Sequence, residues 1–221
     1  MENKRSHSPR KPRNHTRKEV IRKVFRCADL YEKNLNRRRL LFVYAGDNRE
    51  VSSLEVRFGD GQFRHLTGVE TPNMNAKEFY RACRDKRLSE ADIEKRDDGT
   101  TDQKLDMLPS ALSDPGLLAR SIADYIESEH SNLHTDKLVT NKNHWSMGFK
   151  KYRDQIYPLP NTFLNERSGR KQMRGKASRL LAVYYKEPDS RSVWTPLYVN
   201  SFPNAEEYHY PEDWKDRPRP E

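Results

Sequence analysis

The chain has 221 residues, of which 33% are hydrophobic and 34% are charged, and its formal net charge is +9. Its 11 tyrosines, 8 phenylalanines and 3 tryptophans can supply the core of one domain. No apolar run approaches the roughly 18–20 residues of a membrane span, and no apolar segment follows the basic N-terminus, so we expect neither a membrane helix nor a signal peptide.

The positive charge gathers in two blocks. Residues 1–23 carry nine basic residues against two acidic ones, a net charge of +7, and residues 163–179 carry six against one, a net charge of +5. Two basic blocks indicate a polyanionic partner, with nucleic acid the first candidate, although a solvated tail and loop would look the same. The only cysteines, Cys27 and Cys83, favour a reducing, intracellular setting, and a disulfide between them stays open.

Three segments follow from these patterns. Residues 1–15 lack apolar periodicity and are predicted to be a basic disordered tail. Residues 16–202 form the predicted domain, and residues 203–221 an acidic, proline-containing tail. Thr16 followed by Glu19 is the pattern of a capping box, and it predicts that an amphipathic helix of about five turns begins there.

The first two thirds of the domain then mix a hairpin with helices. Residues 40–58 alternate around a Gly-Asp-Asn turn and predict a β-hairpin. The stretch 63–69 is read as the extended end of this strand region. Helices are predicted over 76–85, in short pieces near 105–112, and from Asp114-Pro115 to about residue 130, where Asp is the N-cap and Pro the first helical residue.

The last third is predicted to consist of strands. Candidate strands cover residues 138–140, 145–149, 162–164, 180–185 and 193–199, the last at a sheet edge because Pro196 interrupts it. The fold class is therefore α+β: an N-terminal helix and β-hairpin, a helical middle and a C-terminal antiparallel sheet.

Most motif-based chemistries are absent from the sequence. It contains no phosphate-binding loop, no dinucleotide fingerprint and no G-x-S-x-G elbow. His130 and His134 have helical spacing but are typical of a solvated helix end, so we expect no metal site and no cofactor.

His65 is the strongest remaining candidate. Metal-free RNA cleavage needs a base for the 2′-OH, an acid for the 5′-oxygen and a cation for the phosphorane. In an extended segment Thr67 points to the same side as His65, and the basic loop 166–176 supplies cations. The alternative is a histidine that merely holds a turn.

Several motifs resemble the phage-associated members of the barnase–EndoU–colicin–RelE-like nuclease superfamily, in particular its fourth phage-associated group. The clearest similarity lies in residues 28–93 and 157–199. The motifs are Leu30-Tyr31-Glu32, Asn34-Leu35, Arg39-Leu40-Leu41-Phe42-Val43-Tyr44, Leu54-Glu55-Val56, Phe63-Arg64-His65-Leu66-Thr67-Gly68-Val69, Phe79-Tyr80 and Leu159-Pro160-Asn161-Thr162-Phe163-Leu164.

The resemblance implies a metal-independent ribonuclease on an α+β scaffold, in a superfamily of toxins and mobile-element effectors. By motif, His65 and Thr67 carry over as catalytic residues. Three further catalytic candidates, chosen for their chemistry and their location in the matching C-terminal region, are Lys171, Arg174 and Thr162. The expected nucleic-acid-binding residues are Arg64, Arg167, Arg170 and Lys176.

The expected function is cleavage of RNA to a 2′,3′-cyclic phosphate in the cytoplasm of a bacterial or phage-infected cell. RNA is the expected partner, with an acidic inhibitor protein suggested by analogy with toxins and no membrane partner. One alternative is a non-catalytic nucleic-acid-binding protein that uses the basic tail and loop. Another is a protein-interaction module marked by Trp145, Trp194 and Trp214, although tryptophans are more often core residues.

Overall fold

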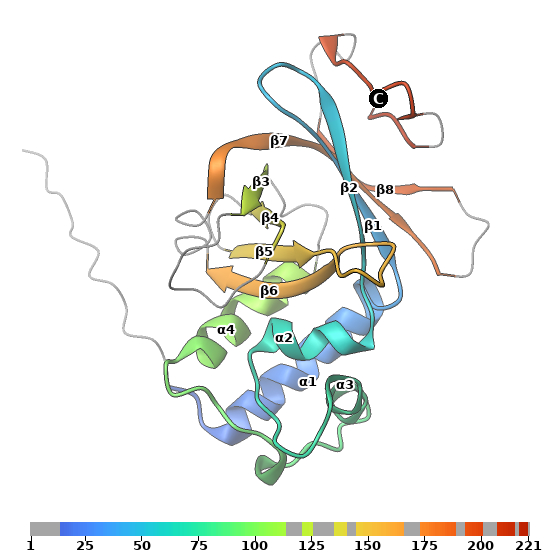
Figure 1. The fold of residues 1–221 in the computed structure, drawn as a ribbon. Coiled ribbons are helices and arrows are strands. Elements are labelled where there is room, and N and C mark those ends of the chain that lie inside the picture. The colour runs from blue at the N-terminus through green and yellow to red at the C-terminus, as the bar shows by residue number, and fades with distance from the viewer. Residues whose placement is uncertain are drawn as a thin grey trace, which may run out of the picture.

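The structure, a computed structural model, describes residues 14–113, 121–125, 135–140, 145–165, 173–188, 193–200, 207–214 and 217–220. It has the predicted α+β class, and Figure 1 shows the helices lying together beneath a curled antiparallel sheet. The helices are α1 (Arg17–Asn34), α2 (Phe63–Thr67), α3 (Ala76–Arg84) and α4 (Thr100–Ser113), with 3₁₀ turns η1 (Asp60–Gln62) and η2 (Glu90–Asp92). The strands are β1 (Arg39–Ala45), β2 (Val51–Arg57), β3 (Ser121–Tyr125), β4 (Lys137–Thr140), β5 (Trp145–Lys150), β6 (Leu159–Asn165), β7 (Met173–Lys186) and β8 (Thr195–Val199).

Helix α1 begins where the sequence predicts. The Thr16 hydroxyl accepts from the backbone N–H of Glu19 (3.2 Å), and the Glu19 carboxylate accepts from the backbone N–H of Thr16 (2.8 Å), so the capping box is confirmed. At the other end, Asn34 Nδ2 donates to the carbonyl of Leu112 (2.6 Å). Asn34 thereby satisfies a carbonyl that the C-terminus of α4 would leave without a helical partner.

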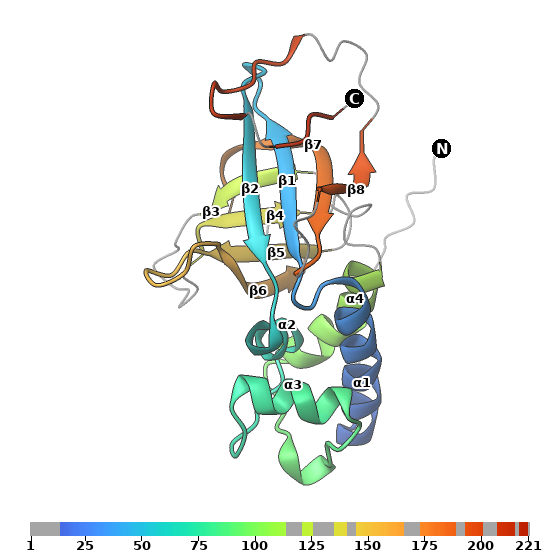
Figure 2. The ribbon, with the colours of Figure 1, turned by 90° about the vertical axis from the view of Figure 1, so that its right-hand side faces the viewer.

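The predicted hairpin is confirmed as β1 and β2, with Leu40 opposite Val56 and Phe42 opposite Leu54. The strand order is β2-β1-β7-β3-β4-β5-β6, and β8 pairs with β7. The pairing of β7 with β1 and with β3 changes register at an irregularity, as expected of bulges that bend a sheet. In Figure 2, β1 and β2 run across the curled strands β3 to β6. The curl brings β6 back to β2, where the N–H of Arg57 donates to the carbonyl of Pro158 (3.1 Å).

Three local predictions need correction. Residues 63–67 are helical rather than extended, and Gly68 ends this helix in the left-handed region, with φ 69°. Within the helix predicted for 114–130, Ser121–Tyr125 is strand β3, because it pairs with β4 on one side and β7 on the other. The rest of that range lies outside the described residues. The basic loop 166–176 overlaps β7 from Met173 onward, and its residues 166–172 are not described.

Apolar side chains are buried on both faces of the sheet. The larger core lies between the sheet and the helices and includes Trp145, which is 3% exposed. The smaller core covers the outer face of β1 and β7, where the C-terminal segment 207–214 places Trp214, 2% exposed. Both tryptophans are therefore core residues. Within the described part of the chain, no helix has the length and apolar character needed to cross a membrane.

The two cysteines, Cys27 and Cys83, are buried free thiols in this larger core. Burial raises the pKa of both thiols, that of Cys27 to about 12. A thiol with so high a pKa carries little thiolate at neutral pH, so neither cysteine has the character of a nucleophile.

Candidate active site

A cavity of about 600 Å³ opens where α2, α4 and β6 meet. Three stretches that are far apart in the sequence line it: residues 64–72, residues 94–104 and the pair Asn161-Thr162. The lining residues are Arg64, His65, Gly68, Val69, Glu70, Thr71, Pro72, Glu94, Arg96, Lys104, Asn161 and Thr162. The fold therefore brings His65 and Thr162, both predicted from the sequence, to one cavity.

His65 lies in the last turn of α2, and its side chain is exposed at the cavity. Its imidazole makes no hydrogen bond to any other described residue. Partial desolvation lowers the pKa of His65 below its ordinary value of 6.5, and the nearby cations Arg64 and Lys104 lower it further. The ring is therefore mostly neutral at pH 7 and able to accept a proton.

Lys104 of α4 lines the cavity and was not among the residues that the sequence analysis identified. It is only 8% exposed, and its Nζ donates to the backbone carbonyl of His65 (3.1 Å). No carboxylate of the described residues lies within 4 Å of this ammonium group. Burial lowers the pKa of Lys104 to about 8, and the charge of Arg96 contributes. A buried lysine that titrates near neutrality and lines a cavity is typical of a functional site.

Gly68 is the point where α2 and α4 touch. The Thr101 hydroxyl donates to the Gly68 carbonyl (2.7 Å) and accepts from the backbone N–H of Arg96 (3.2 Å). A Cβ at Gly68 would lie 2.9 Å from Lys104 Cδ, so the lysine stem crosses directly over this glycine. The glycine therefore permits both the left-handed turn and the position of Lys104 beneath His65.

We expect Gly68→Ala to destabilise the protein more than Gly99→Ala, which serves as a matched control. Both glycines have positive φ, at a cost of about 1–2 kcal/mol for alanine. A Cβ at Gly99 meets nothing within 4 Å, whereas one at Gly68 strikes Lys104 and costs about 1–3 kcal/mol more. Urea unfolding of both variants measures the difference. Equal losses would show that Lys104 does not press on Gly68.

Thr162 reaches the cavity from the middle of β6. A Cβ at Gly148, its partner in β5, would lie 2.5 Å from Thr162 Cγ2, so the threonine methyl packs against the bare glycine backbone. Thr162 Oγ1 makes no hydrogen bond within the described part of the chain. The adjacent Asn161 is held by Thr135, whose hydroxyl donates to Asn161 Oδ1 (3.1 Å). Thr162 is only 2% exposed, so this wall presents a small part of one residue, with a hydroxyl that has no described partner, to the cavity.

Two predicted residues have structural contacts instead. The Thr67 side chain is fully buried: its hydroxyl donates to the Arg64 carbonyl (2.8 Å) and accepts from the N–H of Val69 (3.2 Å). The expectation that Thr67 points with His65 required an extended backbone, which the helix replaces. Arg64 lines the cavity, but its guanidinium donates to Thr71 Oγ1 (3.0 Å) and to the Met74 carbonyl (2.8 Å). Both residues therefore shape the wall that carries His65.

The comparison with protein families decides the identity. The family model of the phage-Barnase-EndoU-ColicinE5/D-RelE like nuclease4 matches residues 23–193. The chain belongs to this nuclease family. The match includes α2, α4 and β6, the three elements around the cavity. No curated protein and no solved structure matches the chain.

The second basic block of this nuclease is described only in part. Arg167, Arg170 and Lys171 lie outside the described residues. Arg174 and Lys176 belong to strand β7, where the backbone of Arg174 lies opposite Asp124 of β3. That the side chains of this block face the cavity stays a prediction.

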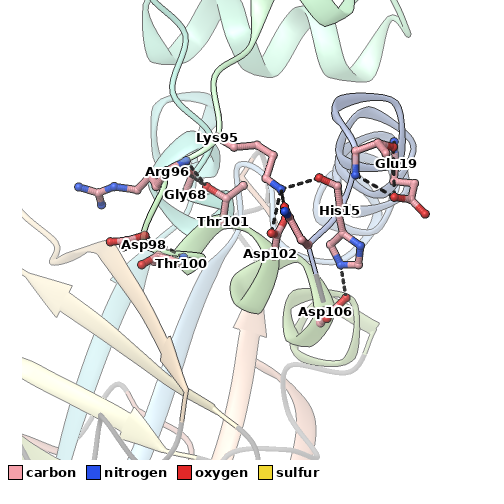
Figure 3. A network of polar contacts seen from close by, with 12 residues as sticks. His15, Glu19, Gly68, Lys95, Arg96, Asp98, Thr100, Thr101, Asp102 and Asp106 are labelled. Carbon is pink, nitrogen blue, oxygen red and sulfur yellow. Dashed lines mark hydrogen bonds and ion pairs between the residues drawn. The ribbon is translucent and has the colours of Figure 1, made fainter. Parts of the chain in front are cut away.

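A second cavity of the nuclease, of about 700 Å³, adjoins the first and shares Glu94 and Arg96 with it. Figure 3 shows the network beside it: the Lys95 ammonium pairs with Asp102 (2.9 Å) and donates to the His15 carbonyl (2.5 Å). The four carboxylates that line this cavity are those of Glu94, Asp97, Asp98 and Asp102. Three permanent cations also line it: Arg17, Lys95 and Arg96. The carboxylates exceed these cations by only one, so this cavity carries no surplus of positive charge to attract a polyanion.

Proposed function

We propose that this nuclease is a metal-independent endoribonuclease that cleaves RNA to a 2′,3′-cyclic phosphate. The observation that supports the proposal is the gathering of His65, Lys104 and Thr162 around one cavity. These residues offer a neutral imidazole, a buried ammonium group and a hydroxyl. Transphosphorylation needs a base, an acid and groups that stabilise the charged phosphorane. The imidazole suits the first role, the ammonium group the second, and the ammonium group and hydroxyl together the third.

Each group has a role in the proposed reaction. His65 takes the proton of the ribose 2′-OH, and the freed oxygen attacks phosphorus. The bond from phosphorus to the 5′-oxygen breaks, and Lys104 protonates that leaving oxygen. The Lys104 charge and the Thr162 hydroxyl stabilise the phosphorane. Lys171 and Arg174 are expected to add cations from the second basic block. The protein thus supplies every proton transfer and charge itself, so the reaction needs no metal ion.

The family name and the basic character of the chain support a biological role. We infer an effector or toxin of a phage or mobile element, acting on RNA in the cytoplasm of a bacterial or infected cell. The net charge of +9 makes an acidic inhibitor protein a suitable antidote, because opposite charges steer association.

Analysis of RNA ends tests the proposed reaction. Incubation with total RNA is expected to produce 2′,3′-cyclic phosphate and 5′-hydroxyl ends at the same rate with and without EDTA. Strict dependence on a divalent cation, or 5′-phosphate ends, would contradict the mechanism. Salt-dependent RNA binding without any cleavage would favour the non-catalytic alternative.

A further inference from the structure

The connection between β5 and β6 returns to the end of β2, the strand that leads into α2. We call this region the β2 corner of the molecule. The N–H of Arg57, the last residue of β2, donates to the carbonyl of Pro158 at the end of this connection. The chain passes from Arg57 through η1 directly into α2. In both Figure 1 and Figure 2 the β5–β6 connection lies near the lower end of β2, from which the chain descends into α2. From there, α2 and β6 lie against each other as far as the cavity that holds His65 and Thr162.

This corner carries exposed cations without carboxylate partners. Arg57, Lys151 and Arg153 are all exposed, and none forms an ion pair with another described residue. The connection from Lys150 to Pro158 contains one acidic residue, Asp154, and the exposed Asp136 carboxylate accepts from the backbone N–H of Lys151 (2.7 Å). Unpaired positive side chains on the approach to a nuclease cavity are suited to the phosphates of a bound strand.

Aromatic rings stand among these cations. Tyr152 is 45% exposed, and the Lys150 ammonium lies 5.8 Å from its ring centre. Tyr157 is held in place by Arg39, which donates to its hydroxyl (2.5 Å) and lies over its ring at 5.1 Å. Tyr157 is half-buried, so Tyr152 is the exposed ring of this connection, next to the unpaired Lys151 and Arg153. An exposed ring beside free cations is a combination by which proteins hold single-stranded nucleic acid, through base stacking and phosphate contacts.

The second cavity has no surplus of positive charge, since four carboxylates and three permanent cations line it. Among the described residues, a strand bound at His65 therefore finds a surplus of cations toward the β5–β6 connection and none toward the second cavity. Tyr157 and Thr162 are five residues apart along the chain, which corresponds to roughly 16 Å at about 3.3 Å per residue. A dinucleotide in the cavity falls short of the connection, whereas a longer strand reaches it.

We propose that residues 150–158, with Arg57, form a subsite for single-stranded RNA that flanks the cleaved bond. The subsite rests on the proposed ribonuclease function for the nature of its ligand. Lys151, Arg153 and Arg57 contact phosphates, and Tyr152 stacks on a base. The subsite raises the affinity for RNA longer than a dinucleotide.

Binding of a 12-nucleotide single-stranded RNA to the His65→Ala protein tests the subsite without cleavage. Adding Lys151→Ala and Arg153→Ala is expected to raise Kd about tenfold and to reduce the slope of log Kd against log salt by about 1.4, at about 0.7 per lost phosphate contact. Adding Tyr152→Ala alone is expected to raise Kd about fivefold or more. The matched control removes one exposed arginine and one exposed lysine of α1 that lie outside the basic block 1–23, Arg26→Ala and Lys33→Ala, and should change Kd by less than twofold.

RNA cleavage by proteins that keep His65 provides the second measurement. The ratio of kcat/KM for the 12-nucleotide substrate to that for a dinucleotide is expected to fall about tenfold in the Lys151, Arg153 double variant. Unchanged Kd in both the lysine-arginine and tyrosine variants would overturn the subsite and leave this corner to an acidic protein partner. Absence of cleavage by the unmodified protein would contradict the proposed function alone, because the binding measurement would still decide the subsite.

Discussion

Replacement of His65 by alanine is expected to lower kcat for RNA cleavage by about 10²- to 10⁴-fold, the usual contribution of a general base. The fold should not change, because the imidazole is exposed at the cavity and makes no hydrogen bond to other described residues. Measuring cleavage of a short labelled RNA together with the thermal melting curve separates loss of catalysis from loss of structure.

His209→Ala is a suitable control for this experiment. His209 is also exposed, but it joins the sheet through its backbone, which accepts from Val51 (2.9 Å) and donates to Arg49 (3.0 Å). Its side chain lies outside the cavity. Full activity of the control with loss in His65→Ala supports the base assignment, and full activity of both variants would refute it.

Local signals in the sequence predicted much of the scaffold. The capping box at Thr16 and the alternation in the hairpin are strong because neighbouring residues alone determine them. Helix α2 is harder to predict, since it has five residues and no side-chain cap at Gln62, and only Gly68 marks its end. Strand β3 owes its conformation to pairing with β4 and β7, which no pattern within residues 114–130 reveals.

The site was predicted only in part for a similar reason. His65 could be predicted from its chemistry and its motif, and Thr162 from its chemistry and its location in the matching C-terminal region. Lys104 escaped notice because a lysine on a helix is usually solvated. A signal was nevertheless present: Thr101, Lys104, Leu105 and Leu108 have the spacing of one helix face, and all four are buried. A lysine within an apolar stripe is therefore worth testing as a site residue.

Lys104→Met is expected to lower kcat/KM for RNA by about 10²- to 10³-fold while making the protein more stable. Methionine has a similar length and no charge, so it removes the acid and the cation that face the phosphorane. The buried cation also costs stability: lowering the pKa from 10.5 to about 8 corresponds to about 3 kcal/mol. Since the hydrogen bond to the His65 carbonyl is lost as well, we expect a net gain of about 1–3 kcal/mol at pH 7.

The pH dependence tests the buried charge and its role separately, because any buried lysine with a lowered pKa changes stability with pH, whereas only a catalytic one changes the rate. Between about pH 8 and 10.5 the unfolded chain keeps the Lys104 proton that the folded protein has lost, so the free energy of unfolding rises with pH in this window. The methionine variant should lack that rise.

Cleavage should depend on a neutral His65 and a charged Lys104, giving a bell-shaped profile of kcat/KM whose upper limb falls near pH 8. Urea unfolding from pH 6 to 10 and the rate profile of the unmodified protein test both halves. A rate that stays constant from pH 7 to 10, with a destabilised methionine variant, would show that Lys104 only supports the fold.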